Sequence, residues 1–133
     1  MAQHTIHFSE IHTAGVAAGD KRCTIRSPRK RPIAAGDTLK LRGPRFAGRG
    51  KIHPQAARLL RTATCVGVHQ VILHFARDQS VLAIGISGER AFEVPSCVRD
   101  FARMDGFENA LEMGRFFVKL HGPEPFYGIL IRW

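Results

Sequence analysis

The first 43 residues switch between two patterns of apolar and polar positions. Residues 4–8 (HTIHF) alternate with a period of two, which predicts a strand. Residues 9–19 begin with serine, a favoured N-cap, and end with glycine, a favoured C′ residue, which predicts a short helix. The period of two returns in residues 22–26 (RCTIR) and 38–43 (TLKLRG), on either side of the turn signal AAGD at 34–37. The predicted order is strand, helix, strand, turn, strand.

The middle of the chain combines an irregular stretch with a strand-rich one. Residues 43–58 contain glycines, prolines and basic residues with little periodicity, which predicts a long loop. Residues 61–87 are rich in Val, Ile and Thr, with Asp78-Gln79 at the centre, and they predict a long β-hairpin with its tip there. A further short strand is expected near residues 91–94.

The last 40 residues predict two helices and a final strand. Helices are expected over residues 95–104 and from Asp105 to about residue 122, and an apolar strand over residues 126–133. The second helix carries an apolar stripe at helical spacing, formed by Phe107, Leu111, Phe116 and Leu120. Strands first, two late helices and a final strand predict one α+β domain spanning residues 1–133. We expect it to be a small, mostly antiparallel β-barrel with two or three flanking helices.

Composition favours a soluble, cytoplasmic protein without a metal. The 133 residues contain no run of about 20 apolar residues and no signal-peptide pattern, so neither a membrane partner nor export is expected. The three cysteines, Cys23, Cys65 and Cys97, form no CxxC pair, and the histidines match no ligand spacing. We therefore expect reduced thiols and no structural metal. The sequence leaves the oligomeric state open.

The net charge of +9 is concentrated in one region. Residues 20–61 hold 13 of the 20 Lys and Arg residues and only two acids, whereas the rest of the chain holds seven bases and nine acids. Such a segment is typical of proteins with a phosphate-bearing partner, and equally of a solvated loop that keeps a protein soluble. Phe46, which lies among arginines in the loop LRGPRFAGRGK, could stack on a base, although one aromatic residue is weak support.

Lys21 and Thr24 are candidates for a base and a nucleophile. Strand periodicity places Thr24 on one face with Arg22 and Arg26, while Lys21 belongs to the preceding connection and could fold back toward that face. A lysine, with an ordinary pKa of about 10.4, becomes a better base when nearby cations and burial lower that pKa. The alternative is an exposed lysine at a helix end and a threonine selected for its β propensity.

Asp105 has two interpretations. Its spacing to Glu108 matches a capping box, so Asp105 could cap the second helix. A carboxylate in the turn between two helices could instead orient a water molecule or a ligand amine. Both interpretations remain open at this point.

Four segments, in order, resemble the ASCH domain, a family of small PUA-like β-barrels. They are GDKRCTIR, the later Gly36-Asp37, FARMDGF and HGPEPFYGILIRW. The resemblance covers nearly the whole chain, and residues 43–58 are the least similar part. It implies a function related to RNA or nucleosides.

Some small bacterial members of that family hydrolyse the amide of N4-acetylcytidine with a lysine, a threonine and an acidic residue. The resemblance places these roles on Lys21, Thr24 and Asp105, although the hydrolases usually have Glu at the third position. It implies that Lys21 deprotonates Thr24, which attacks the acyl carbonyl. Asp105 would position the substrate or water, and Arg22 or Arg26 would stabilise the oxyanion. No metal or organic cofactor is expected.

Other ASCH-like proteins imply a different function for the basic region. Some are assigned ribonuclease activity or RNA binding, and RNA would suit residues 20–61 better than an uncharged nucleoside does. The alternative is therefore an RNA-binding protein or metal-independent ribonuclease. A third option is an RNA-adaptor domain that has lost activity.

Overall fold

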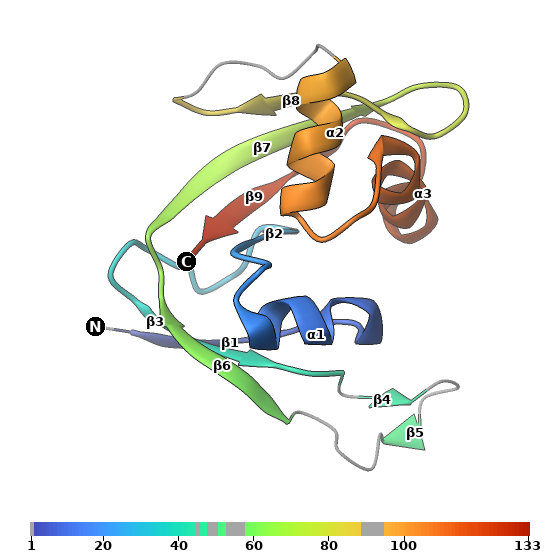
Figure 1. The fold of residues 1–133 in the computed structure, drawn as a ribbon. Helices are drawn as coiled ribbons and strands as arrows, with labels where there is room; N and C mark the ends of the chain where they lie inside the picture. Colours follow the sequence, from blue (N-terminus) through green and yellow to red (C-terminus); the bar gives the residue numbers. More distant parts are fainter. Residues whose placement is uncertain (1, 45, 48–50, 53–57, 89–94) are drawn as a thin grey trace.

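The computed structural model describes residues 2–44, 46–47, 51–52, 58–88 and 95–133 (Figure 1). Their helices and strands are β1 (Gln3–His7), α1 (Glu10–Ala18), β2 (Cys23–Arg26), β3 (Thr38–Arg42), β4 (Phe46–Ala47), β5 (Lys51–Ile52), β6 (Leu59–Thr64), β7 (Gly67–Phe75), β8 (Val81–Ile86), α2 (Pro95–Met104), α3 (Ala110–His121) and β9 (Phe126–Arg132). The α+β class is therefore confirmed. The short strand expected near residues 91–94 lies outside the described residues.

A three-stranded sheet in the order β1-β3-β6 forms one half of the molecule. β1 and β3 are parallel, which is possible because α1 and β2 lie between them in the sequence, and β3 and β6 are antiparallel. The sheet packs against α1 through buried residues that include Ile6, Val16, Leu39 and Leu41. This packing fixes α1, and with it the connection that carries Lys21.

A four-stranded antiparallel sheet in the order β2-β9-β7-β8 forms the other half. α2 and α3 pack against it, with contacts to β8, and Figure 1 shows both helices on the same side of the sheet. Their core includes Phe101, Phe107, Met113 and Phe117. The region between this core and the one under α1 is where α1, β2 and the α2–α3 connection meet.

The predicted hairpin is confirmed over residues 67–86, and only its first residues, 61–64, belong elsewhere. β7 and β8 pair around a tip at Asp78-Gln79, where Gln79 has a φ of 74°. The preceding residues form β6, which belongs to the other sheet, because hydrogen bonding changes partners at Cys65-Val66. The Cys65 amide donates to Asp37 O, whereas the Val66 amide donates to Arg132 O at the end of β9.

The described strands form open sheets, so the predicted small β-barrel is not confirmed. Strands β1 and β2 lie at the edges of the two sheets and do not pair with each other. Two arginine side chains bridge the space between them: Arg26 Nη2 donates to His7 O (2.7 Å) and Arg29 Nη2 donates to Thr5 O (3.2 Å). They thereby satisfy carbonyls on the unpaired edge of β1.

Two helix C-termini position the candidate site residues. α1 ends in a Schellman motif, in which Gly19 (φ 84°) donates to Val16 O and the next amide donates to Gly15 O. The Lys21 amide also donates to Gly15 O, which sets the direction in which the chain leaves the helix.

α2 ends in the same way. Gly106 (φ 92°) donates to Arg103 O and Phe107 donates to Ala102 O, so Asp105 occupies the C-cap position of α2. The capping-box interpretation of Asp105 is therefore wrong. The N-cap of α3 is Asn109, whose side chain accepts from Glu112 N at 2.8 Å. The helix therefore begins about one turn later than the expected start at Asp105.

No helix in the described ranges is long and apolar enough to cross a membrane.

We predict that Gly106→Ala destabilises the protein more than Gly88→Ala does. Both glycines have positive φ, 92° and 76°, so both substitutions carry a backbone cost of about 1 kcal/mol. A Cβ at Gly88 would meet no atom of the described residues within 4 Å, whereas one at Gly106 would lie 2.8 Å from His12 Nδ1. Urea denaturation should therefore show at least about 1 kcal/mol of additional loss for Gly106→Ala. Equal losses would show that this contact is not part of the fold's stability.

Candidate active site

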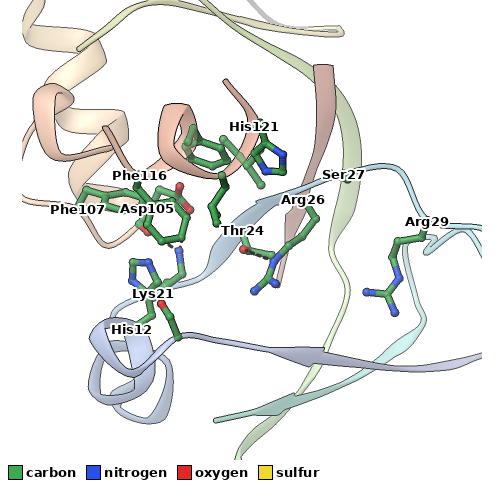
Figure 2. Close-up of a pocket in the computed structure, with 14 residues that line it drawn as sticks. His12, Lys21, Thr24, Arg26, Ser27, Arg29, Asp105, Phe107, Phe116 and His121 are labelled. Carbon is green, nitrogen blue, oxygen red and sulfur yellow. Dashed lines mark hydrogen bonds and ion pairs between the residues drawn. The ribbon is translucent and has the colours of Figure 1, made fainter. Parts of the chain in front are cut away.

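A cavity of about 460 Å³ lies where α1, β2 and the two late helices meet (Figure 2). Its walls come from the first turn of α1, from β2 and the residues that follow it, from the α2–α3 connection, and from α3. Lys21, Thr24, Arg26 and Asp105, four of the six residues selected from the sequence, line this one cavity. Its volume is within the range of small-molecule sites.

A buried ion pair joins Lys21 to Asp105. Lys21 Nζ lies 2.8 Å from Asp105 Oδ1, and both side chains are 3% exposed. The same ammonium also donates to the main-chain carbonyl of Asp105, at the C-terminus of α2. A cation in this position is stabilised by both the carboxylate and the negative end of the helix dipole.

Burial changes the protonation behaviour of the groups around this pair. It raises the pKa of the Asp105 carboxyl above its ordinary value, and the nearby charges of Lys21 and Arg26 oppose that rise. Cys23 Sγ lies 3.8 Å from Asp105 Oδ1. Burial and the charge of Asp105 raise the pKa of Cys23 to about 12, so Cys23 stays a thiol at neutral pH and is a poor nucleophile.

Arg26 holds the hydroxyl oxygen of Thr24. Its Nε donates to Thr24 Oγ1 at 3.1 Å, and Figure 2 shows the two side chains next to each other on β2. The predicted period of two is therefore correct for this pair. The guanidinium also lies 4.9 Å from the centre of the Phe8 ring. Burial lowers the pKa of Arg26, but arginine keeps its charge in proteins. Thr24 thus has a fixed cationic donor on its oxygen.

Lys21 and Thr24 face the same cavity without a hydrogen bond between them. The two hydrogen bonds of Lys21 Nζ go to Asp105, and Thr24 Oγ1 accepts from Arg26. One N–H of the ammonium and the hydroxyl proton of Thr24 have no partner in the described part of the chain. Both are available to a ligand in the cavity.

An aromatic wall closes another side of the cavity. It consists of Phe107, Phe116, Phe117 and His121. The Phe107 and Phe116 ring centres are 5.2 Å apart, and Phe117 stacks on His121 at 6.2 Å. Such a surface suits a flat ring, since aromatic side chains stack on every nucleobase.

His12 is a buried, neutral histidine beside the ion pair. Its ring is 7% exposed and meets Phe107 edge-on at 5.0 Å. Burial, together with the charges of Lys21 and Arg26, lowers the pKa of His12 to about 4. Its Nδ1 atom has no hydrogen-bond partner in the part of the chain that the structure describes. His12 therefore adds a neutral polar edge to a site that otherwise consists of charges and aromatic rings.

Of the other two residues predicted from the sequence, one lies away from the cavity and the side chain of the other is not described. Arg22 is exposed, donates through Nε to Gly19 O at 3.0 Å, and does not line the cavity. It lies before the start of β2, so the period of two does not extend to it. Phe46 is in β4, and its side chain is outside what the structure describes.

Several residues that line the cavity are not predicted as site residues by the sequence. The sequence pattern places Phe107, Phe116 and Leu120 in one apolar helical stripe, and such a stripe does not distinguish core from cavity wall; in the structure Phe107 lies before α3 and only the other two are helical. His12 matches no motif. Arg29 is one of many cations in a basic segment, and nothing in the sequence sets it apart.

No protein-family model, curated protein or solved structure matches this chain.

In the described ranges, no three His, Cys, Asp or Glu residues are grouped so that they could hold a metal ion.

We predict that His12 makes the protein less stable in acid. Between pH 6.5 and about 4 the unfolded chain protonates this histidine while the folded protein resists protonation. The unfolded state therefore binds more protons, and the free energy of unfolding falls as the pH falls through this window. The loss should amount to roughly 3 kcal/mol by pH 4.

Urea denaturation of wild type and His12→Gln across this range measures the effect. The variant should have the shallower pH dependence below pH 6.5, and the two curves should run parallel above pH 7. Equal slopes below pH 6.5 would contradict the assignment of a neutral, buried His12.

Proposed function

We propose that the protein is an amidohydrolase that removes the acyl group from N4-acetylcytidine or a related N4-acylated cytosine nucleoside, and that it is a member of the ASCH family. One observation carries the proposal. The three residues that the sequence singles out for catalysis, Lys21, Thr24 and Asp105, face one cavity, although 84 positions separate the first from the last. The aromatic wall of the same cavity offers a stacking surface for a cytosine ring.

The first step of the proposed reaction forms an ester on Thr24. After the Lys21 ammonium has released a proton to water in the cavity, the free amine takes the hydroxyl proton while Thr24 Oγ bonds to the acyl carbon and the carbonyl oxygen becomes an oxyanion. Thr24 Oγ1 already accepts from Arg26 Nε at 3.1 Å, so the guanidinium lies beside the place where negative charge develops. A fixed cation in that place stabilises the transition state more than the substrate.

The leaving group then takes the proton back. The oxyanion collapses, the bond from the acyl carbon to N4 breaks, and N4 receives the proton held by the Lys21 ammonium, which leaves an amino group on cytosine. A water molecule next gives its proton to Lys21 and attacks the ester. When the bond from the acyl carbon to Thr24 Oγ breaks, the proton returns to Thr24 and the carboxylic acid is released.

Asp105 acts through Lys21 in this scheme. Its carboxylate and its main-chain carbonyl both bind Lys21 Nζ, so they fix the direction of the amine and stabilise its protonated form. This is the role that an orienting carboxylate has behind a catalytic base. Asp105 is 2% exposed, which supports a positioning residue over one that contacts the substrate.

As part of the proposed ASCH membership, we also propose that the two sheets form a small β-barrel. β1 and β2 are the edges of the two sheets, and Arg26 and Arg29 connect them through side chains. A small barrel that is open between these two strands would have this arrangement.

The function is tested by incubating the pure protein with N4-acetylcytidine and following the ultraviolet change to cytidine. We expect turnover by wild type and a loss of about a thousandfold or more in Thr24→Val, which keeps the shape of the side chain and removes its hydroxyl. Thr24→Ser should retain measurable activity.

Arg22→Gln is the matched control for Arg26→Gln. Both remove one guanidinium, but only Arg26 contacts Thr24, so we expect a loss of about a hundredfold for Arg26→Gln and little change for Arg22→Gln. Wild-type turnover in Thr24→Val, or no hydrolysis of any N4-acylated cytidine by wild type, would remove the proposal.

A further inference from the structure

The cavity has more positive than negative charge on its walls. Lys21, Arg26 and Arg29 line it, and the only carboxylate among its lining residues in the described part of the chain is Asp105. Asp105 forms an ion pair with Lys21 at 2.8 Å and also acts on Arg26 through its charge, so three cationic side chains share one carboxylate among the described lining residues. An excess of positive charge in a partly enclosed site favours an anionic ligand.

The two guanidiniums are held next to each other by the edge of β1. Arg26 donates to His7 O and Arg29 donates to Thr5 O. These carbonyls are two residues apart along the strand, which is a distance of about 7 Å. Burial is the main cause that lowers the pKa of Arg26; the charge of Asp105 opposes this, and the charge of Arg29 lowers the pKa further, as expected for two like charges close together. An anion beside Arg29 would relieve this repulsion.

Arg29 lies at the other end of the cavity from the ion pair. Figure 2 shows Lys21 and Asp105 toward one end, Thr24 and Arg26 in the middle, and Arg29 at the far end. In a cytosine nucleotide the N4 group and the 5′ phosphate likewise lie at opposite ends of the molecule. A ligand with its amide at Thr24 would therefore carry its phosphate toward Arg29.

We propose that the substrate is the nucleoside 5′-monophosphate and that Arg29, with the neighbouring hydroxyl of Ser27, binds its phosphate. This rests on the proposed function. Arg29 donates one N–H to Thr5 O, its other N–H groups make no hydrogen bond to the described part of the chain, and Ser27 lines the same cavity. A phosphate monoester carries nearly two negative charges at neutral pH, which matches the excess of three lining bases over one lining acid better than the single charge of a phosphodiester in RNA does.

Calorimetric binding of the deacylated products tests this without requiring turnover. We expect cytidine 5′-monophosphate to bind wild type about tenfold or more tightly than cytidine does, because charge-assisted hydrogen bonds to the phosphate are added. Arg29→Gln should remove this difference. Lys30→Gln is the matched control, because Lys30 is an exposed neighbouring cation that does not line the cavity, and it should keep the difference.

Three results would overturn the inference. Cytidine and its monophosphate could bind alike, or Lys30→Gln could act as strongly as Arg29→Gln. A short cytidine-containing RNA could instead bind more tightly than the monophosphate through Arg29, which would indicate a strand as the ligand.

A further experiment distinguishes failure of the hydrolysis proposal from failure of the anion subsite. If only the hydrolysis proposal is wrong, N4-acetylcytidine and its monophosphate would not be hydrolysed, yet inorganic phosphate would still raise the melting temperature of wild type and not that of Arg29→Gln. Such a result would support the anion subsite and reject the reaction.

Discussion

The ion pair between Lys21 and Asp105 connects the two halves of the molecule at the point where the cavity forms. Lys21 follows the C-terminus of α1, which packs on the three-stranded sheet, and Asp105 ends α2, which packs on the other sheet. Moving both charges out of water costs several kcal/mol for each ion, and the cost is offset only if the geometry holds. Two Schellman turns supply that geometry, because Gly19 and Gly106 direct the chain toward the pair. The rest of the cavity is arranged around this contact.

The fixed position of Lys21 in this ion pair also supports the chemistry we propose. A lysine whose position is fixed by a carboxylate and a helix carbonyl does not have to be ordered when a substrate arrives. Thr24 is fixed in a similar way by Arg26, whose Nε donates to Thr24 Oγ1 and whose Nη2 donates to His7 O in β1. The arginine thus serves the fold by satisfying an edge carbonyl and serves the reaction by facing the nucleophile. The cationic side chains that line the cavity repel one another in the free protein, and an anionic ligand would relieve that repulsion.

Local patterns in the sequence predict the parts of the site that depend on local structure. The period of two in RCTIR places Thr24 and Arg26 on one face, and the Ser9 to Gly19 frame predicts α1. The role of Asp105 could not be predicted in the same way, because a capping carboxylate and a buried ion-pair partner look alike until the tertiary structure brings Lys21 to it. The change of sheet at Cys65-Val66 is also not local, since its hydrogen bonds go to Asp37 and Arg132. For the same reason the aromatic wall could not be distinguished from core.

A double-mutant cycle with Lys21→Met, Asp105→Leu and the double variant measures most directly how strongly the ion pair stabilises the fold. Urea denaturation in a stabilising osmolyte gives all of them a folded baseline. Each single variant leaves one buried charge without a partner and should lose about 3 to 5 kcal/mol, whereas the double variant should lose clearly less than the sum, with a coupling of at least about 2 kcal/mol. Losses that add to within about 0.5 kcal/mol would show that the pair does not hold the two halves together.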